Sequence, residues 1–258
     1  MAESSPSDAS PIAAHAVPLL TFGGVSKRFP DGTTALDGVE LRVPAGEFVS
    51  VIGPSGCGKS TLLRIASDLT RATGGTVEVQ TRKIGYVFQD PTLLPWRTVQ
   101  ANVELFAELR GLPRAERRRR ADDAIRLVGL SDFAGHRPRA LSGGMRMRVS
   151  LARSLTLQPE LFLFDEPFGA LDEITRERMN DELLQLYLTQ RFTAVFVTHS
   201  VTEAVFLSTR VLVMSGRPGR ILGDFAVPFE YPRPPRLRFE QRFARLAGQV
   251  SARLRGGG

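Results

Sequence analysis

The sequence predicts an α/β fold in which helices cover a mostly parallel β-sheet, and three observations lead to this prediction. Residues 161–164 and 193–197 are continuous apolar runs, as expected for parallel strands that are buried on both faces. A third β-prone run, residues 47–52, leads directly into the glycine-rich stretch GPSGCGKST at residues 53–61. A loop of this composition between a strand and a helix is typical of α/β proteins that bind phosphate groups.

The first part of the chain divides into a polar tail and a strand-rich region. Residues 1–18 are rich in Ser, Ala and Pro and lack periodicity, which predicts a disordered tail. Residues 20–79 alternate short β-prone runs with Gly, Pro and Asp turns. One short helix, at residues 61–65, is expected directly after the glycine-rich stretch.

A helical lobe is expected to interrupt the β pattern, at about residues 91–155. Apolar residues recur there at helical spacing from residue 99 onward, with charges between them. After Pro228 the Pro-rich stretch 232–235 interrupts regular structure, and residues 239–254 fit a basic amphipathic helix. We therefore expect one domain over residues 19–228 and a C-terminal extension over residues 229–258.

Composition narrows the cellular setting. The 258 residues are 42% hydrophobic and 24% charged, enough to bury one full core. No stretch approaches about 18 consecutive apolar residues, and no secretory leader precedes the domain, so we expect neither membrane insertion nor export. The only cysteine, Cys57, fits a reducing compartment.

The net charge of +7 raises the question of a nucleic-acid partner. Much of that charge comes from the Arg-rich run at residues 114–120, which contains Glu116 and is followed by Asp122 and Asp123. Interleaved charges of this kind favour a solvated helix face over a functional basic patch. No nucleic-acid partner is expected on this basis.

The glycine-rich stretch has the chemistry of a nucleotide site. Backbone N–H groups at the start of a helix favour phosphate, and glycines let the backbone approach it closely. Lys59 is expected to neutralise the β- and γ-phosphates, the Ser60 hydroxyl to ligate Mg²⁺, and Thr61 to help hold the phosphates. The expected cradle comprises Gly53, Pro54, Ser55, Gly56, Cys57, Gly58, Lys59, Ser60 and Thr61.

Two acids follow the apolar run 161–164. Asp165 and Glu166 would lie at the carboxyl end of a buried strand, where α/β sheets present their ligands. Asp165 is expected to orient Mg²⁺, and Glu166 to polarise the attacking water in a hydrolysis. An Asp-Glu pair alone is more often a solvated turn or a helix start, but together with the phosphate loop the catalytic interpretation is favoured.

With these residues and the stretch LSGGM at 141–145, the chain from 19 to 228 resembles the ATP-binding subunit of an ABC (ATP-binding cassette) transporter. The resemblance implies a P-loop NTPase (RecA-like) core with an antiparallel β subdomain and an inserted α-helical subdomain. In that family the LSGGQ signature of one subunit closes over the γ-phosphate of ATP held by the other, which implies a homodimer. Ser142, Gly143 and Gly144 match the signature, and Met145 replaces its usual Gln.

Further positions match family motifs. The resemblance implies that Gln89 links Mg²⁺ and the attacking water to the helical lobe, and that His199 contacts the γ-phosphate. Asp172 matches the segment that couples the two sites of the dimer. Phe29 matches the aromatic that stacks on adenine, with core packing as the alternative. Ser200 stands where the family commonly has Asp, and Ser-x-x-Glu predicts a capping box at the next helix.

Two segments resemble importers rather than the family at large. Residues 90–99, DPTLLPWRTV, resemble the importer surface that receives a membrane permease, with Trp96 as an aromatic anchor or, alternatively, a core residue. Residues 211–221 resemble the nitrate/sulfonate/taurine importer group. The resemblance implies a peripheral subunit at the cytoplasmic face of the bacterial inner membrane. This subunit would energise uptake of a small solute, for which an anion such as a sulfonate or nitrate is one candidate.

The partners implied are integral membrane permease subunits and, through them, a solute-binding protein. Two other functions stay open at this point. An exporter ATPase shares the catalytic motifs, and a soluble ABC ATPase acting on ribosomes or DNA would use the positive charge. Ribosome- or DNA-acting relatives usually carry two cassettes or a long coiled-coil insertion, and the sequence shows neither.

Overall fold

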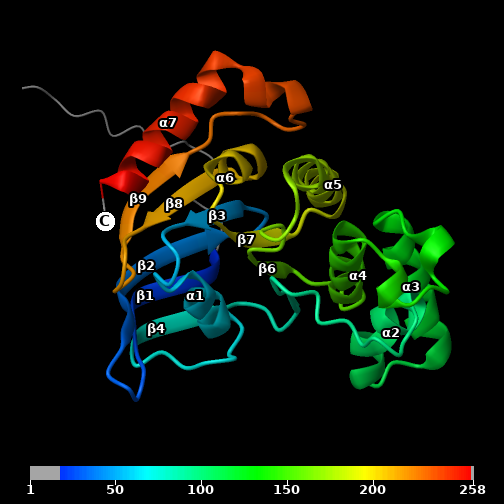
Figure 1. The fold of residues 1–258 in the computed structure, drawn as a ribbon. Coiled ribbons are helices and arrows are strands. Elements are labelled where there is room, and N and C mark those ends of the chain that lie inside the picture. Colours follow the sequence, from blue (N-terminus) through cyan, green and yellow to red (C-terminus); the bar gives the residue numbers. More distant parts are fainter. Residues whose placement is uncertain (1–17, 257–258) are drawn as a thin grey trace, which may run out of the picture.

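The computed structural model describes residues 18–256 and contains two β-sheets with helices packed around them (Figure 1). The larger sheet has the order β5-β6-β7-β3-β8-β9, parallel except for its β8-β9 edge. Its strands are β3 (Phe48–Ile52), β5 (Ile84–Val87), β6 (Leu161–Asp165), β7 (Thr193–Thr198), β8 (Arg210–Met214) and β9 (Ile221–Ala226). The predicted α/β class is therefore confirmed.

The smaller sheet is antiparallel and has the order β2-β1-β4. It consists of β1 (Pro18–Arg28), β2 (Thr34–Pro44) and β4 (Gly74–Val79). Residue 18, which we assigned to the disordered tail, already belongs to β1, and residues 1–17 of that predicted tail lie outside the described residues. This sheet supplies the antiparallel β subdomain that was expected beside the parallel core.

The parallel sheet separates two apolar cores because its side chains alternate between its faces. Leu161 and Leu163 of β6 join the core formed with the antiparallel sheet and α1 (Lys59–Ala66). Phe162 and Phe164 join the core on the other face, which the remaining helices cover. Both faces are thus dry, which explains the uninterrupted apolar runs in the sequence.

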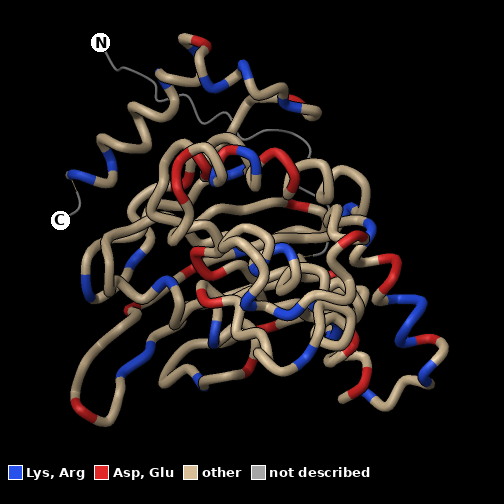
Figure 2. Tube along the Cα trace, turned by 45° about the vertical axis from the view of Figure 1, so that its right-hand side comes forward, with Lys and Arg blue, Asp and Glu red and all other residues tan. Residues whose placement is uncertain are grey.

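Three helices lie together at one side of the molecule (Figure 1). They are α2 (Val99–Leu109), α3 (Arg114–Leu127) and α4 (Gly143–Leu155), with short 3-10 turns η1 (Ser131–Phe133) and η2 (Pro138–Ala140) between α3 and α4. Within α3, Glu116 accepts hydrogen bonds from Arg119 and Arg120, so the basic run is partly paired along its own helix. Figure 2 shows basic and acidic residues interspersed along the trace.

The remaining helices pack on the face of the parallel sheet that carries Phe162 and Phe164, opposite α1. They are α5 (Glu173–Gln190), α6 (Val201–Leu207), the 3-10 helix η3 (Pro235–Phe239) and α7 (Gln241–Arg255). The predicted C-terminal helix at 239–254 starts two residues too early, because Phe239 ends η3 and is 84% exposed. None of the helices within residues 18–256 combines the length and the apolarity that crossing a membrane requires.

Candidate active site

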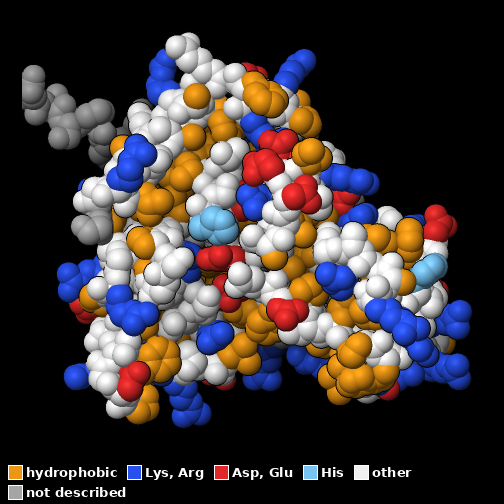
Figure 3. Space-filling model, in the orientation of Figure 1, with side chains coloured by type: hydrophobic (Ala, Val, Ile, Leu, Met, Phe, Trp, Pro, Cys, Tyr) orange, Lys and Arg blue, Asp and Glu red, His pale blue; other side chains and the backbone are white. Residues whose placement is uncertain are grey.

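The candidate site forms where the carboxyl ends of three adjacent strands meet. The neighbours β6, β7 and β3 run parallel, so the residues that follow them converge at one edge of the sheet. The phosphate loop follows β3, Asp165 and Glu166 end β6, and His199 follows β7. Figure 3 shows a histidine near the middle of one face of the molecule with acidic side chains beside it.

The phosphate loop owes its tight path to glycine. Gly58 has a φ of 108°, and a Cβ there would lie 2.7 Å from the carbonyl oxygen of Ala35. Gly58 is also the N-cap residue of α1. The helix therefore begins at Lys59, two residues before the predicted start at residue 61. The N–H groups of its first turn, which have no partner within the helix, directly follow the loop.

Lys59 is buried and bridges the loop to the end of β6. Its Nζ donates to the carbonyl oxygens of Gly53 (2.9 Å) and Pro54 (3.0 Å). The same Nζ lies 3.5 Å from Oε1 of Glu166. The buried ammonium group is thus neutralised by Glu166 and hydrogen-bonded to the loop.

Asp165 is the convergence point of two hydroxyl groups. Ser60 Oγ donates to Oδ1 of Asp165 at 2.8 Å, and Tyr86 Oη donates to Oδ2 at 3.1 Å. Burial, reinforced by the Asp165 charge, raises the pKa of Tyr86, so this phenol keeps its proton and stays a donor. Nothing in the sequence pattern singled out Tyr86, because the residues of this contact are 79 positions apart.

Glu166 and His199 form a second pair at the same edge. Oε2 of Glu166 lies 3.2 Å from Nδ1 of His199, whose side chain is about half exposed. Glu166 has a φ of 46°, an uncommon conformation for a residue with a side chain. Its backbone N–H donates to Val197 of β7, which holds the turn against the neighbouring strand.

The turn that carries His199 is held by a different network from the one predicted. Ser200 caps α6 by accepting from the N–H of Glu203, as expected of a capping box. The carboxylate of Glu203 does not return to the Ser200 N–H, however; it points inward and accepts from the Thr198 hydroxyl. The Ser200 N–H donates instead to Thr198 Oγ1. Burial raises the pKa of Glu203.

The other predicted residues lie on separate elements. Ser142 is the N-cap of α4 and accepts from the Met145 N–H, while Asp172 is the N-cap of α5 and accepts from the Thr175 N–H. Within residues 18–256 no hydrogen bond or ion pair joins Ser142, Gly143 or Gly144 to the phosphate loop. A single chain therefore does not bring its own signature onto its own loop.

Gln89 and Phe29 lie at the edges of the site region. The side chain of Gln89 is exposed and has no hydrogen bond with another described residue. Phe29 is half-buried beside the β1-β2 turn, with Lys27 Nζ 5.2 Å from its ring centroid. Trp96 is 68% exposed, so the alternative of a core tryptophan is wrong.

A contact to the phosphate loop comes from far along the chain. The Nε and Nη2 atoms of Arg217 donate to the carbonyl oxygen of Gly56, at 3.2 and 3.1 Å. The sequence placed Arg217 only in a stretch typical of importers, and nothing there indicated contact with the loop. The close approach depends on β8 lying next to β3 in the sheet.

This fold and site define a P-loop NTPase cassette: a phosphate loop at a helix start, with a carboxylate pair and a histidine at the next strand ends. The family model for the ABC transporter matches residues 36–169, just over half of the sequence. The chain therefore belongs to the ABC transporter family and is an ABC-type ATPase.

Individual relatives agree with this assignment. An aliphatic sulfonates import ATP-binding protein, SsuB 1 of Mesorhizobium japonicum, is 47% identical over 92% of this chain and 89% of its own. A taurine import ATP-binding protein, TauB of Rhizobium johnstonii, is 46% identical over 76% of this chain and 77% of its own. The predicted family is confirmed.

Solved structures share the fold. A dimeric bacterial ABC transporter cassette is similar with a TM-score of 0.72 and 33% identity, over 82% of this chain and 100% of that chain. A second structure of that cassette, with the same similarity, is a dimeric post-hydrolysis state bound to ADP and Pi. These neighbours confirm the predicted P-loop NTPase fold.

Proposed function

We propose that this chain is the ATP-hydrolysing subunit of an importer that takes up a small sulfonate through a separate membrane permease. The observation that carries the ATPase part is the convergence of Lys59, Ser60, Asp165, Glu166 and His199 at one sheet edge, linked by contacts of 2.8 to 3.5 Å. Two relatives are named for import of aliphatic sulfonates and of taurine, whose shared group is the sulfonate. An exporter is not favoured, because these relatives are named for import.

The phosphate loop and Lys59 would bind the triphosphate of ATP. Loop amides at the start of α1 supply hydrogen bonds to the phosphates, favoured by the helix dipole. Lys59 would then exchange Glu166 for phosphate oxygens, because its ammonium already points at the loop. This exchange frees the Glu166 carboxylate for the reaction only when nucleotide is present.

Ser60 and Asp165 fit a Mg²⁺ ion bound together with the nucleotide. Their oxygens are hard donors that Mg²⁺ prefers, and they already lie 2.8 Å apart. Among the described residues no group of three or more His, Cys, Asp or Glu could hold a metal ion, which fits an ion completed by phosphates and water. When bound, Mg²⁺ would neutralise charge that develops on the phosphate oxygens.

Glu166 and His199 would act on the attacking water. Phosphoryl transfer to water needs a nucleophile held in line with the leaving group and a group that polarises it. Of the two acids that follow the apolar run, Asp165 accepts hydrogen bonds from hydroxyl groups and Glu166 does not. The contact with His199 orients the Glu166 carboxylate. His199 is half exposed and so remains accessible to a γ-phosphate. Gln89, at the end of β5, would report the state of this centre to the helical lobe.

Two copies of the chain would complete two ATP sites. Ser142, Gly143 and Gly144 start α4, so their free amides can bind the γ-phosphate held by the partner's phosphate loop. Asp172 lies beside this start, because Leu171 approaches Gly143 and Thr175 approaches Gly144. ATP shifts the pair toward a closed dimer only through its higher affinity for that form.

The permease would dock on the segment formed by residues 90–98, which we call the docking segment. Its Trp96 is exposed, and aromatic side chains are common anchors at protein interfaces. Phe88, two residues before this segment, lines a hollow of about 240 Å³ together with Phe106 and Leu109. A permease at this site places the subunit peripherally at the cytoplasmic face of the membrane, where a solute-binding protein reaches it only through the permease.

Purification from membranes tests the proposal. Tagged Glu166→Gln protein, made in the bacterium from which the sequence comes, would be isolated from detergent-solubilised membranes with ATP present, and its partners identified by mass spectrometry. A multi-span permease is expected, and Trp96→Ala in the same background should lose it while still binding ATP. Recovery of ribosomes or nucleic acid without a permease would contradict the proposal. The paired binding protein would then be titrated with taurine, alkanesulfonates and nitrate, of which only the sulfonates should bind.

A further inference from the structure

A buried arginine without a counter-charge lies in the last turn of α4. The side chain of Arg153 belongs to a residue that is only 3% exposed, and no carboxylate among residues 18–256 forms an ion pair with it. Burial lowers the pKa of Arg153 for this reason. A buried charge of this kind is costly unless hydrogen bonds compensate it. The hydrogen-bond partners of Arg153 therefore indicate which segments of the chain it positions.

Apart from a 3.5 Å hydrogen bond to Ser150 Oγ of its own helix, the contacts of Arg153 lead to the docking segment and to α2. Arg153 donates to the carbonyl oxygens of Pro91 (2.9 Å) and Thr92 (3.1 Å), and to Thr92 Oγ1 (3.2 Å). Its guanidinium group lies over the ring of Phe106 in α2, 4.8 Å from the centroid. Thr92 itself has a φ of 47°, a strained conformation for a β-branched residue that the Arg153 bonds help to maintain.

The other end of the docking segment is held by a second buried side chain. Asn102 of α2 accepts from the Leu94 N–H and donates to the carbonyl oxygens of Leu94, Arg97 and Thr98. Arg153 and Asn102 thus anchor the segment at its two ends, and exposed Trp96 lies between them. The segment has one defined shape whose position depends on α4 at one end and on α2 at the other.

The signature residues 142–144 lie at the opposite end of α4. Arg153 follows Ser142, which caps the start of the helix, by 11 residues, so about 16 Å separates the two residues along α4. The last turn of α4 also holds β5, because Ser154 Oγ donates to the carbonyl oxygen of Tyr86. We infer that Arg153 is a positioning residue that couples nucleotide engagement at the start of α4 to the position of the docking segment. This inference rests on the proposed function, in which nucleotide contacts residues 142–144 and the permease contacts residues 90–98.

The single tryptophan makes the coupling measurable without a permease. Because Trp96 is the only tryptophan in the chain, its emission reports the docking segment alone when the excitation wavelength spares the three tyrosines. In Glu166→Gln protein, ATP would be titrated while Trp96 emission and dimer formation are followed in parallel. We expect Trp96 emission to change with the same ATP midpoint as dimer formation. In Arg153→Met the amplitude of this emission change should fall about fivefold or more.

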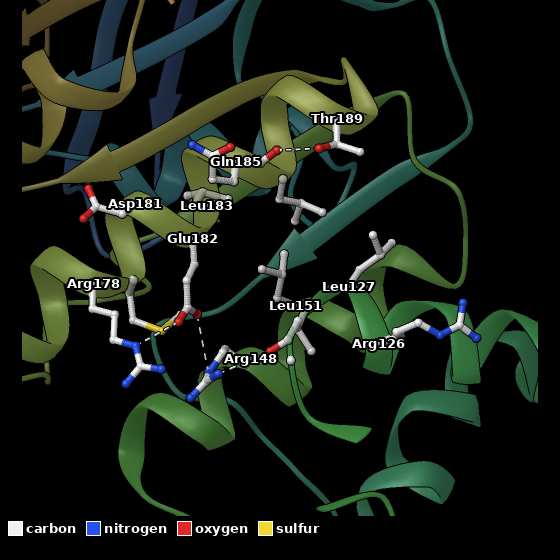
Figure 4. A pocket seen from close by; sticks show the side chains of 14 residues that line it. Arg126, Leu127, Arg148, Leu151, Arg178, Asp181, Glu182, Leu183, Gln185 and Thr189 are labelled. Atoms are coloured by element: carbon white, nitrogen blue, oxygen red, sulfur yellow. Dashed lines mark hydrogen bonds and ion pairs between the residues drawn. The ribbon is translucent and has the colours of Figure 1, made fainter. Parts of the chain in front are cut away.

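The variants separate coupling from simple damage to α4. Arg153→Met should dimerise with a midpoint within about twofold of its parent, and Arg153→Lys, which keeps the charge but loses the forked geometry, should regain part of the amplitude. Arg148→Met is the matched control, since Arg148 lies on the same helix but pairs with Glu182 of α5 (Figure 4). It should leave the Trp96 response unchanged.

A gentler variant covers the case in which Arg153→Met does not fold. Thr92→Gly changes an exposed position, relieves the positive φ and removes one acceptor of Arg153, so it should also lower the amplitude. The inference is overturned if ATP closes the dimer without changing Trp96 emission, if Arg153→Met keeps the full amplitude, or if Arg153→Met folds and still loses dimer formation and emission change together. All three results are readable even if no permease co-purifies.

Discussion

Replacing Gly219 by Ala is expected to weaken ATP binding about tenfold, because the added methyl group would displace the phosphate loop. Gly219 is fixed in place from both sides: its N–H donates to Ala35 at 2.9 Å, and its carbonyl accepts from the Asp37 N–H at 3.1 Å. A Cβ at this position would lie 2.2 Å from the carbonyl oxygen of Cys57 and 2.6 Å from the Met214 side chain. Met214 can adjust its rotamer, whereas Cys57 can move only with the loop.

The size of the effect follows from that overlap. A carbon and a carbonyl oxygen need about 3.2 Å, so the loop and residue 219 must separate by about 1 Å, and overpacking of this kind costs about 1–3 kcal/mol. Since about 1.4 kcal/mol corresponds to a factor of ten in affinity, a loop that bears roughly the middle of this cost binds ATP about tenfold more weakly.

The assay compares two glycines of the loop between β8 and β9. ATP affinity would be measured by equilibrium binding, and the free energy of unfolding by urea denaturation, for Gly219→Ala and for Gly216→Ala. A Cβ at Gly216 meets no atom within 4 Å, so this control should change either quantity by less than about 0.5 kcal/mol. Equal ATP affinity and stability for Gly219→Ala and the unmodified chain would refute the steric argument.

Three further substitutions test individual contacts. Tyr86→Phe removes the hydroxyl that donates to Asp165, and should lower kcat about tenfold while leaving ATP affinity nearly unchanged; a normal kcat would show that this bond does not position the carboxylate. Glu203→Gln tests a buried carboxyl whose pKa is raised by burial. The protonated form is favoured in the folded chain, so the stabilisation from Glu203 is complete below its ordinary pKa and is lost as pH rises through the raised value. The free energy of unfolding, measured with urea, should therefore fall less between about pH 4 and about pH 8 in Glu203→Gln than in its parent. An equal fall in both proteins would contradict a raised pKa for Glu203. Asn102→Leu should lower the free energy of unfolding by about 2–4 kcal/mol, as measured by urea denaturation, because four hydrogen bonds to the docking segment disappear; a change below about 0.5 kcal/mol would contradict this role.

The parts of the site that were predictable from sequence are those that one short segment encodes. The phosphate loop is nine consecutive residues, and its strand-loop-helix context is visible in the chain, so the loop and the fold around it were placed correctly. Asp165 and Glu166 end a continuous apolar run, which locates them at the carboxyl edge of the sheet. The catalytic and binding roles of these residues stay predictions.

The parts that were missed depend on strand order and on side-chain direction. Tyr86 reaches Asp165 only because β5 lies beside β6, a pairing that no local pattern encodes. Arg153 is one of several arginines in α4, and periodicity gave no sign that this one is buried. Glu203 fitted a capping box, yet the Thr198 hydroxyl offered a buried partner and drew its carboxylate inward. Such choices are made by tertiary packing.

The central claim, that two copies of this chain build each ATP site, is tested most directly by measuring mass in solution. Glu166→Gln protein would be examined by analytical ultracentrifugation with and without ATP, alone and combined with Ser142→Asp. Asp is as good an N-cap as Ser, so α4 keeps its start while a carboxylate opposes the partner's γ-phosphate. The account predicts twice the 28.3 kDa chain mass with ATP for Glu166→Gln alone, and the monomer for the double variant. A monomer in ATP-saturated Glu166→Gln, or an undiminished dimer in the double variant, would contradict it.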